Sequence, residues 1–278
     1  MTGENMKDEH GFFTDPMTGL CAALCKAAGV RPPEQAAPAS TELTDELFSR
    51  YGAFTADRIM IYNPDAIGDW VMDKYIGKFA RSLEYAPVRH RFITVFPPKT
   101  PVCFASMYTG AEPEVHGILK YEKPVVTIDS IFDAFIKAGK KPCIVSVKNQ
   151  SMDRIFRGRD MDYFSERYDD EVVEKALELI KKDEYDLLCV YNQRYDDAIH
   201  FTHPKSRRAR RALDCYNVNF DKLVAAVKEH WSGHDTLIGM CPDHGVHRML
   251  IGTGNHGKNI PKDMNISHLF GFLPKQDR

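Results

Sequence analysis

The sequence predicts a three-layer α/β/α sandwich with a mostly parallel central sheet. Short apolar runs typical of strands alternate with amphipathic stretches typical of helices over most of the 278 residues. Such alternation implies crossover connections, parallel strand pairing and helices on both faces of the sheet. The apolar fraction of 43% and the charged fraction of 27% are those of ordinary globular proteins, which excludes a disordered, collagen-like or coiled-coil chain.

The first part of the chain predicts two helices joined by a linker. One helix is expected over 12–29, a proline-rich stretch over 31–38 breaks it, and a second helix covers Thr41–Tyr51. We therefore expect an N-terminal helical extension and linker at 1–52 and the main α/β domain at 53–278.

The main domain is expected to alternate strands and helices. The expected strands are 58–62, 91–96, 142–147, 185–191 and 236–240, and the expected helices are 66–83, one that starts at Pro101, 127–138, 170–182 and 205–231. Thr127 is the expected cap of the third helix. Because ligands of such sheets bind beyond the carboxyl ends of the strands, the polar residues that follow each strand are the candidate functional residues.

Carboxylates, imidazoles and a threonine follow four of the expected strands. They are Asp65, Thr100, Asp196, His200, Asp243, His244 and, a little later, His256. Carboxylate and imidazole ligands suit zinc or a similar divalent ion. A single residue of this kind is usually a helix cap or a surface group, but so many at one sheet edge are hard to assign to capping alone.

Thr100 is the expected N-cap of the helix that starts at Pro101, with the proline in the favoured first helical position. A hydroxyl in that place faces free backbone N–H groups and the positive end of the helix dipole, which suits an anionic substrate. Threonine is a poor nucleophile unless a base or a metal ion activates it.

The segment 99–118 carries a specific motif. Thr100 lies nine residues before the first residue of Thr109-Gly110, and Pro113-Glu114-Val115-His116-Gly117-Ile118 follows. This arrangement resembles the nucleophile segment of the alkaline phosphatase superfamily, in its type I phosphodiesterase/nucleotide pyrophosphatase branch, which includes phosphonoacetate hydrolase. The resemblance runs from about Arg58 to the C-terminus and implies an alkaline phosphatase-like catalytic domain at 53–278.

The resemblance also implies a ligand set and a mechanism. One metal ion would be held by Asp65, Asp243, His244 and Thr100, and the other by Asp196, His200 and His256. Members of the family commonly carry two divalent ions, with zinc the expected metal. Thr100 would attack phosphorus in line and form a phospho-threonine intermediate, which water then hydrolyses.

The chain departs from the family's pattern at the substrate contacts. Five residues after His116, where relatives have an asparagine that helps to hold a phosphate oxygen, this sequence has Tyr121, preceded by Lys120. Lys148 resembles a lysine of phosphonoacetate hydrolase that contacts the substrate carboxylate, and a solvated lysine is the alternative. We expect Tyr121, Lys120 and Lys148 to bind substrate.

Two further departures concern the metal ligands. The common Asp-Gly is Asp65-Ala66 here, so Asp69 is a fallback ligand. Only eleven residues separate His244 from His256, where relatives place a longer capping insertion. The sequence therefore predicts a minimal cap, which leaves the site open or covered by a neighbouring subunit of a homo-oligomer. His203 and His247 flank ligands and could orient them.

These residues predict a phosphohydrolase that cleaves a phosphodiester or phosphomonoester, such as a nucleotide. The enzyme alternatives are a phosphonate (C–P) hydrolase and a mutase or phosphotransferase that excludes water from the same phospho-threonine. The alternative without catalysis is a metal-dependent binder of phosphate ligands. All of them take a small-molecule phosphate or phosphonate as partner.

Composition bears on the partners and on the location. The formal net charge of −2 argues against a general nucleic-acid binder, and no apolar stretch reaches the roughly 18 residues of a membrane span. The chain starts without the pattern of a secretory signal, and its seven cysteines include no CxxC pair. We therefore expect free thiols and a cytoplasmic protein.

Overall fold

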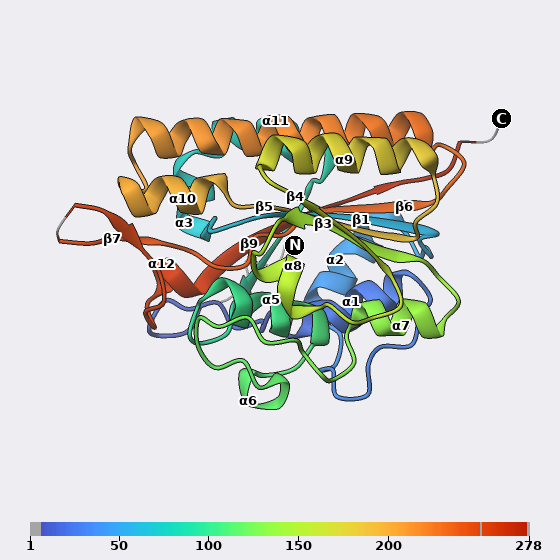
Figure 1. Cartoon of the computed structure of the whole chain (residues 1–278), viewed down its shortest axis with the longest axis horizontal. Helices are drawn as coiled ribbons and strands as arrows, with labels where there is room; N and C mark the ends of the chain where they lie inside the picture. The colour runs from blue at the N-terminus through green and yellow to red at the C-terminus, as the bar shows by residue number, and fades with distance from the viewer. Residues whose placement is uncertain (1–6, 251, 277–278) are drawn as a thin grey trace.

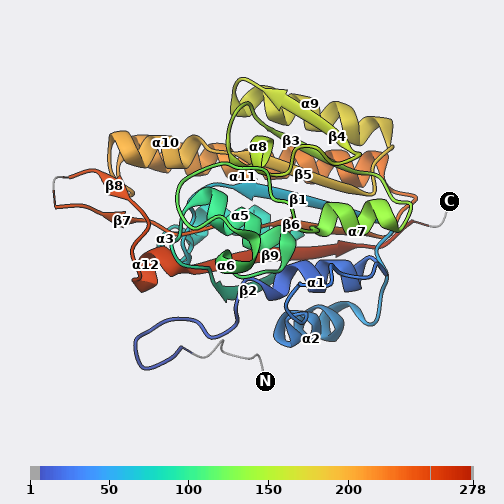
Figure 2. The ribbon, with the colours of Figure 1, turned by 60° about the horizontal axis from the view of Figure 1, so that its bottom comes forward.

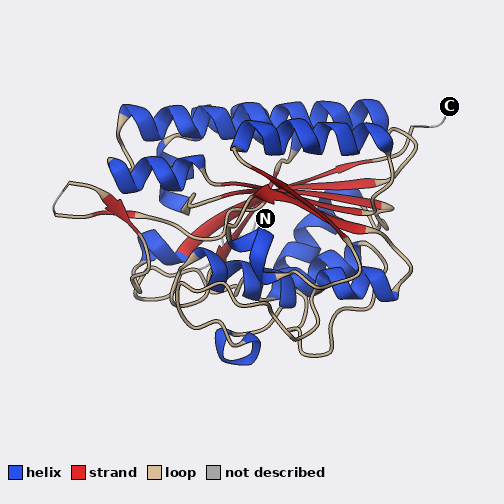
Figure 3. Ribbon diagram, in the orientation of Figure 1, coloured by secondary structure: helices blue, strands red, loops and turns tan. Residues whose placement is uncertain are grey.

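A seven-stranded sheet separates two layers of helices in the computed structural model, which describes residues 7–250 and 252–276 (Figures 1 and 3). The strands lie in the order β2-β9-β6-β1-β5-β3-β4. Their bounds are Arg58–Pro64 (β1), Val88–Ile93 (β2), Pro142–Val147 (β3), Asp162–Glu166 (β4), Leu187–Asn192 (β5), Thr236–Met240 (β6) and Asn265–Leu273 (β9). Two short strands, β7 (His247–Arg248) and β8 (Gly254–Asn255), form a separate hairpin.

The strands of the sheet are mostly parallel. β1 pairs in parallel with β5 and β6, and β3 pairs in parallel with β4 and β5. Only β9 runs against its neighbours, β6 and β2. The predicted sandwich with a mostly parallel sheet is confirmed.

One helical layer packs above the sheet in the view of Figure 1 and one below it. The upper layer contains α3 (Asp69–Lys74), η1 (Ile76–Phe79), α4 (Ala80–Tyr85), α9 (Asp169–Lys182), α10 (Arg194–Phe201) and α11 (Arg207–His230). The lower layer contains α1 (Gly19–Ala27), α2 (Thr41–Tyr51), α5 (Thr100–Thr109), α7 (Ile131–Lys137) and α8 (Ser151–Ile155). Two short helices, α6 (Pro113–His116) and α12 (Pro261–Met264), lie in connections.

Each face of the sheet has its own hydrophobic core. Successive side chains of a strand point to opposite faces. In β1, Ile59 and Ile61 therefore lie in the core with the lower helices, whereas Met60 and Tyr62 lie in the core with the upper ones. The continuous apolar run of this strand reflects burial on both faces.

The N-terminal helices share the lower core. Leu20 and Leu24 of α1 are almost fully buried in the same cluster as Phe104 and Tyr108 of α5. Figure 2 shows α1 and α2 along the side of the sheet that carries β2 and β9. The division at residues 52 and 53 stays a prediction.

Several element boundaries differ from the prediction. The helix expected over 66–83 is broken into α3, η1 and α4. The helix expected over 127–138 starts at Ile131, because Ser130 and Asp133 form a capping box there and Thr127 caps nothing. The helix expected from residue 12 starts at Gly19, since residues just before it hydrogen-bond to the sheet: the N–H of Met17 donates to the carbonyl of Ile93 at 2.9 Å.

Three strands of the seven-stranded sheet were misplaced or missed, and the hairpin of β7 and β8 was not predicted. β2 spans 88–93 rather than 91–96, because its inward residues Val88, His90 and Phe92 alternate with charged ones that hide the pattern. β4 and β9 were not predicted. β9 completes the sheet between β2 and β6.

The seven cysteines are free, as expected, and six of them are buried. Among the described residues, no helix is long and apolar enough to cross a membrane. The cytoplasmic location stays a prediction.

His90 of β2 forms a buried ion triad that joins the N-terminal region to the sheet. Its Nε2 lies 2.7 Å from Asp15 and its Nδ1 lies 2.8 Å from Glu46, and the ring is fully buried. Asp15, Glu42 and His90 could in principle hold a metal ion, but both ring nitrogens already have carboxylate partners. Burial opposes the charge on His90, yet the two hydrogen bonds outweigh it, so the pKa of His90 is raised.

We expect His90→Gln to lower the free energy of unfolding by about 3 kcal/mol at pH 6, because it leaves two carboxylates without their cation. The charge on His90 stabilises the fold fully below the ordinary pKa of histidine, about 6.5, and this contribution is lost as the pH rises through the raised pKa. Urea unfolding at pH 6 and pH 9 measures the difference, which should shrink at the higher pH. The exposed His10→Gln is the control, and an equal loss at both pH values would contradict the charged triad.

Candidate active site

The topology brings the ends of three neighbouring strands together. β1 lies between β5 and β6, with Pro64 opposite Asn192 and Tyr62 opposite Met240. Asp65 therefore leaves the sheet beside the segments that carry Asp196 and Asp243. Because all three strands are parallel, these carboxylates lie at one edge.

The first group of candidate ligands consists of Asp65, Asp243 and His244. His244 Nε2 lies 3.5 Å from Asp65 Oδ1 and 3.4 Å from Asp243 Oδ2, and all three side chains are buried. Thr100 Oγ1 lies 3.3 Å from the same Nε2. The two adjacent residues Asp243 and His244 converge because they stand in an irregular loop after β6.

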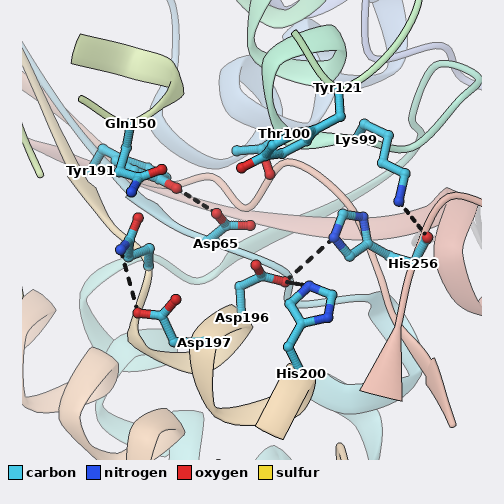
Figure 4. Close-up of a pocket in the computed structure, with 11 residues that line it drawn as sticks. Asp65, Lys99, Thr100, Tyr121, Gln150, Tyr191, Asp196, Asp197, His200 and His256 are labelled. Carbon is cyan, nitrogen blue, oxygen red and sulfur yellow. Dashed lines mark hydrogen bonds and ion pairs between the residues drawn. The ribbon is translucent and has the colours of Figure 1, made fainter. Parts of the chain in front are cut away.

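The second group consists of Asp196, His200 and His256. Asp196 Oδ1 lies 3.3 Å from His200 Nε2, one turn away on α10, and 3.6 Å from His256 Nε2 (Figure 4). The two groups adjoin, because the rings of His244 and His256 stack with their centroids 3.9 Å apart. The structure thus brings together the seven residues predicted to hold metal and nucleophile.

The chemistry of these side chains fits divalent cations. Asp65 Oδ1, Asp196 Oδ1 and Asp243 Oδ2 are buried without a hydrogen-bond partner, and each faces a histidine Nε2. The Nδ1 atoms of His244 and His256 contact the carbonyl oxygens of Gly245 and Pro98, at 3.1 and 2.8 Å. Those contacts leave Nε2 free for a metal, which is the usual arrangement of a histidine ligand.

The electrostatics of Asp65, Asp243, His244 and His256 point the same way. Asp196 and His200 form an ion pair instead: their hydrogen bond raises the pKa of His200, and it outweighs burial and lowers the pKa of Asp196. Burial raises the pKa of Asp243 to about 7, and burial together with the charge of Asp243 raises the pKa of Asp65. Burial lowers the pKa of His244 to about 4 and that of His256 to about 3, so both rings are neutral. Neutral imidazoles beside carboxylates that repel one another are a setting that a divalent cation stabilises.

Thr100 starts α5 but is not its N-cap. Lys99 occupies the cap position and Thr100 is the first helical residue. The expected cap was therefore placed one residue too late. The Thr100 side chain is directed to His244 instead of to the helix N–H groups, and it is 3% exposed, so it lies at the floor of the site.

Two backbone features shape the loops that carry the ligands. Ala66 has a φ of 70°, and its N–H donates to Asp243 Oδ1 at 3.1 Å. A left-handed alanine is strained, whereas glycine would adopt this φ without steric cost. A Cβ on Gly245 would lie 2.1 Å from the carbonyl oxygen of Lys262, so only glycine fits after His244.

A cavity of about 340 Å³ opens over the two groups (Figure 4). Tyr121 lines it, as predicted for a substrate contact. Lys120 does not line it and pairs with Glu122 at 3.5 Å in a largely exposed position. Lys148 lines a neighbouring cavity instead.

Five residues that line the cavity were not predicted. They are Lys99, Gln150, Tyr191, Gln193 and Asp197. Tyr191 donates from its hydroxyl to Asp65 Oδ2 at 2.5 Å, and Lys99 Nζ donates to the carbonyl of His256 at 2.9 Å. Two signals in the sequence could have identified them. Lys99 is adjacent to Thr100, and Tyr191 stands at the end of a predicted strand.

The fallback ligand and the two flanking histidines lie outside the ligand groups. Asp69 accepts hydrogen bonds from Arg89 at 2.7 Å and Ser267 at 2.5 Å, away from the site. The His203 ring accepts a hydrogen bond from the N–H of Lys205 at 3.2 Å, and its carbonyl accepts one from the N–H of Ser206 at 2.9 Å. His247 lies 2.9 Å from the carboxylate of Asp263, which also accepts from the N–H of Lys258 and so supports the loop after His256.

Comparison with known proteins finds a family match over the segment that carries Asp65 and Thr100. The model of the family "Type I phosphodiesterase / nucleotide pyrophosphatase" matches residues 63–126, which include Asp65, Thr100 and Tyr121. No curated protein matches the sequence.

Solved structures match over most of the chain. Murine and human ectonucleotide pyrophosphatase/phosphodiesterase 5 give TM-scores of 0.56 and 0.57 at 16% identity, covering 69% of this chain and 58% and 57% of theirs. Phosphonoacetate hydrolase from Sinorhizobium meliloti 1021, in complex with phosphonoformate, gives 0.51 at 18% identity, covering 69% of this chain and 57% of that one. The chain thus spans less than two thirds of these proteins, and the likeness shows the shared fold.

The segment match and the shared fold together confirm the resemblance found in the sequence, to the type I phosphodiesterase/nucleotide pyrophosphatase branch of the alkaline phosphatase superfamily.

Proposed function

We propose that the protein is a metal-dependent hydrolase of phosphodiesters or phosphomonoesters, with Thr100 as nucleophile and two zinc ions as cofactors. The observation that carries the proposal is the convergence of two carboxylate–histidine groups beside the Thr100 hydroxyl. The segment that matches the phosphodiesterase family contains both Thr100 and Asp65.

The two groups of carboxylates and histidines are the proposed ligands of the two metal ions. Asp65, Asp243 and His244 would hold one ion next to Thr100, and Asp196, His200 and His256 would hold the other. When bound, the ions supply positive charge that lowers the pKa of a nearby hydroxyl and offsets the charge of the phosphoryl oxygens.

The chain's own residues would then carry out a double displacement. Thr100 Oγ1 forms a bond to phosphorus while the bond from phosphorus to the leaving-group oxygen breaks, and the leaving group departs with its electron pair. The proton lost from the Thr100 hydroxyl balances the leaving group, which is released as an alcohol. The oxygen of a water molecule then bonds to phosphorus, the bond from phosphorus to Oγ1 breaks, and a proton of the water restores the hydroxyl. The product is phosphate from a monoester and a phosphomonoester from a diester. The buried place of Thr100 at the floor of the cavity fixes its line of attack.

Lys99 and Tyr191 support this geometry from opposite sides. Tyr191 fixes one oxygen of Asp65 and leaves Oδ1 free, and Lys99 ties the start of α5 to His256. Both contacts fix the position of the ligand loops relative to the Thr100 nucleophile.

A phosphonate hydrolase that cleaves a C–P bond is the second candidate. Murine ectonucleotide pyrophosphatase/phosphodiesterase 5 has been solved with AMP, and the Sinorhizobium enzyme with phosphonoacetate. Ester hydrolysis is favoured here, because Lys148, the residue that resembles the carboxylate-binding lysine, lies outside the cavity that contains Thr100.

A substrate panel tests the proposal. We expect the zinc-loaded protein to hydrolyse p-nitrophenyl phosphate, bis-p-nitrophenyl phosphate or the p-nitrophenyl ester of 5′-TMP, measured by release of nitrophenolate, and to be inactive after chelation. Turnover of phosphonoacetate alone would replace the proposal by the second candidate. Inactivity of the metal-loaded protein on the whole panel would favour a binding protein without catalysis.

A further inference from the structure

A second cavity adjoins the candidate active site. It has a volume of about 330 Å³ and is lined by Lys123, Val125, Lys148, Asn149, Asp153, Arg154, Arg157 and Ser165. Four of these residues are cations and one is an anion, so the cavity has a strong positive charge. None of its lining residues belongs to the two groups of candidate metal ligands.

Internal pairing accounts for only one of the four cations. Arg157 forms a salt bridge with Asp153 and also donates to Ser165 at 2.5 Å, which ties α8 to β4. Among the described residues, Lys123, Lys148 and Arg154 form no ion pair with a carboxylate. Three cations around one cavity without an acidic partner are a setting that favours an anion.

Two hydrogen bonds fix the Nζ atom of Lys123 at this cavity, whereas the end of a solvated surface lysine moves freely. Its Nζ donates to the carbonyl of Asn149 at 3.1 Å and to Gln150 Oε1 at 2.9 Å, and burial lowers its pKa. The position of its charge is therefore fixed, which reduces the entropy lost when an anion binds.

The same contact connects the two cavities. Gln150, which accepts from Lys123, lines the first cavity together with Thr100. Lys123 also lies over the ring of Tyr121, 5.4 Å from its centroid, and Tyr121 lines the first cavity as well. Gln150 and Tyr121 therefore link the lining of the cavity that contains Thr100 to Lys123 of the basic cavity.

We propose that the second cavity binds a second phosphate group of the substrate, with Lys123 and Arg154 as its main contacts and Lys148 at its rim. This inference rests on the proposed function, because it assumes that the first cavity holds the phosphorus to be attacked. It narrows the substrate to molecules with two phosphate groups separated by a short spacer. One cavity with three cations that have no acidic partner among the described residues matches one phosphate group and not the backbone of a nucleic acid.

Calorimetric titration of the zinc-loaded protein tests this inference without relying on turnover. The ligands are alkane-α,ω-bisphosphonates with spacers of two to six carbons, each paired with the alkyl monophosphonate of the same length. We expect the best bisphosphonate to bind roughly tenfold more tightly than its monophosphonate, the gain of about one additional charged contact.

Substitutions in the basic cavity test whether the tighter binding of the bisphosphonate depends on its cations. Lys123→Ala and Arg154→Ala should each remove most of it, with a much smaller effect on the monophosphonate. Arg154→Ala is the cleaner of the two, since the Arg154 side chain contacts Asn149 at 3.5 Å, and its link to Gln150 is a backbone hydrogen bond that the substitution keeps. Lys181→Ala, which removes an exposed charge from the last turn of α9, is the matched control and should keep the gain.

The outcomes separate this inference from the proposed function. If the monophosphonates bind and no bisphosphonate gains affinity at any spacer length, the second phosphate site is overturned and the proposed function stands. A gain that survives in both the Lys123 and the Arg154 variants also overturns it. If the panel of esters is not hydrolysed but the gain is present and lost in both variants, the basic site stands and catalysis does not.

Discussion

Replacing Thr100 with alanine is expected to lower kcat by about 10⁴-fold or more, while the fold and the metal content stay unchanged. The reason is that Thr100 Oγ1 is the hydroxyl that contacts His244 of the first ligand group, and an alanine leaves no oxygen there to attack phosphorus. The loss should appear in kcat, measured by nitrophenolate release at saturating substrate. Metal analysis of the same protein reports whether the ligand groups are intact.

Two further variants make this result specific. Thr100→Ser keeps a hydroxyl and should retain measurable turnover, and a phosphorylated intermediate should be found by mass spectrometry on residue 100 in either active protein. Thr41→Ala, at the exposed start of α2, is the matched control and should behave as the unaltered protein. Full activity of Thr100→Ala would exclude Thr100 as the nucleophile.

His256→Ala is expected to reduce the zinc content from two ions to one per chain and to lower kcat by about 10³-fold. His256 belongs to the group with Asp196 and His200, so its loss weakens one site and leaves the ligands of the other in place. A metal ion contributes several kcal/mol to stabilisation of the transition state, which corresponds to a factor of this size. Plasma emission spectroscopy measures the stoichiometry.

His203→Ala is the matched control for this variant. His203 lies close to His200 in the sequence, but its ring accepts a hydrogen bond from the backbone of Lys205. We expect it to retain both ions and its activity. Retention of two tightly bound ions by His256→Ala, or a metal content unrelated to activity in both variants, would contradict the assignment of the second group.

Much of the site could be predicted because its residues follow regular strands. Asp65 comes directly after β1, and Asp243 comes three residues after the end of β6. Both strands are buried on both faces and therefore read as continuous apolar runs. Parallel pairing then brings these positions to one edge whatever the details of the loops. Asp196 and His200 needed only the helical spacing of α10 in addition.

The parts that could not be predicted depend on tertiary contacts. β9 pairs with strands far away in the sequence, and Ser267, His268 and Gly271 interrupt its apolar run, so the local pattern marks it weakly. The break after α3 and the start of α7 follow from packing and capping that override helix propensity. Lys120 and Lys148 were assigned from their sequence neighbours, and the structure places neither in the cavity with Thr100.

The position of β9 has a consequence for how the protein is made. This strand lies inside the sheet, between β2 and β6, although it is the last of the described strands along the chain. Until the ribosome has released residues 265–273, β2 and β6 are two open edges, which are prone to pair with other chains. Completion of the sheet and of the site that it positions therefore has to wait for the synthesis of β9, and a chain cut short before β9 should aggregate instead of folding to a partly active form.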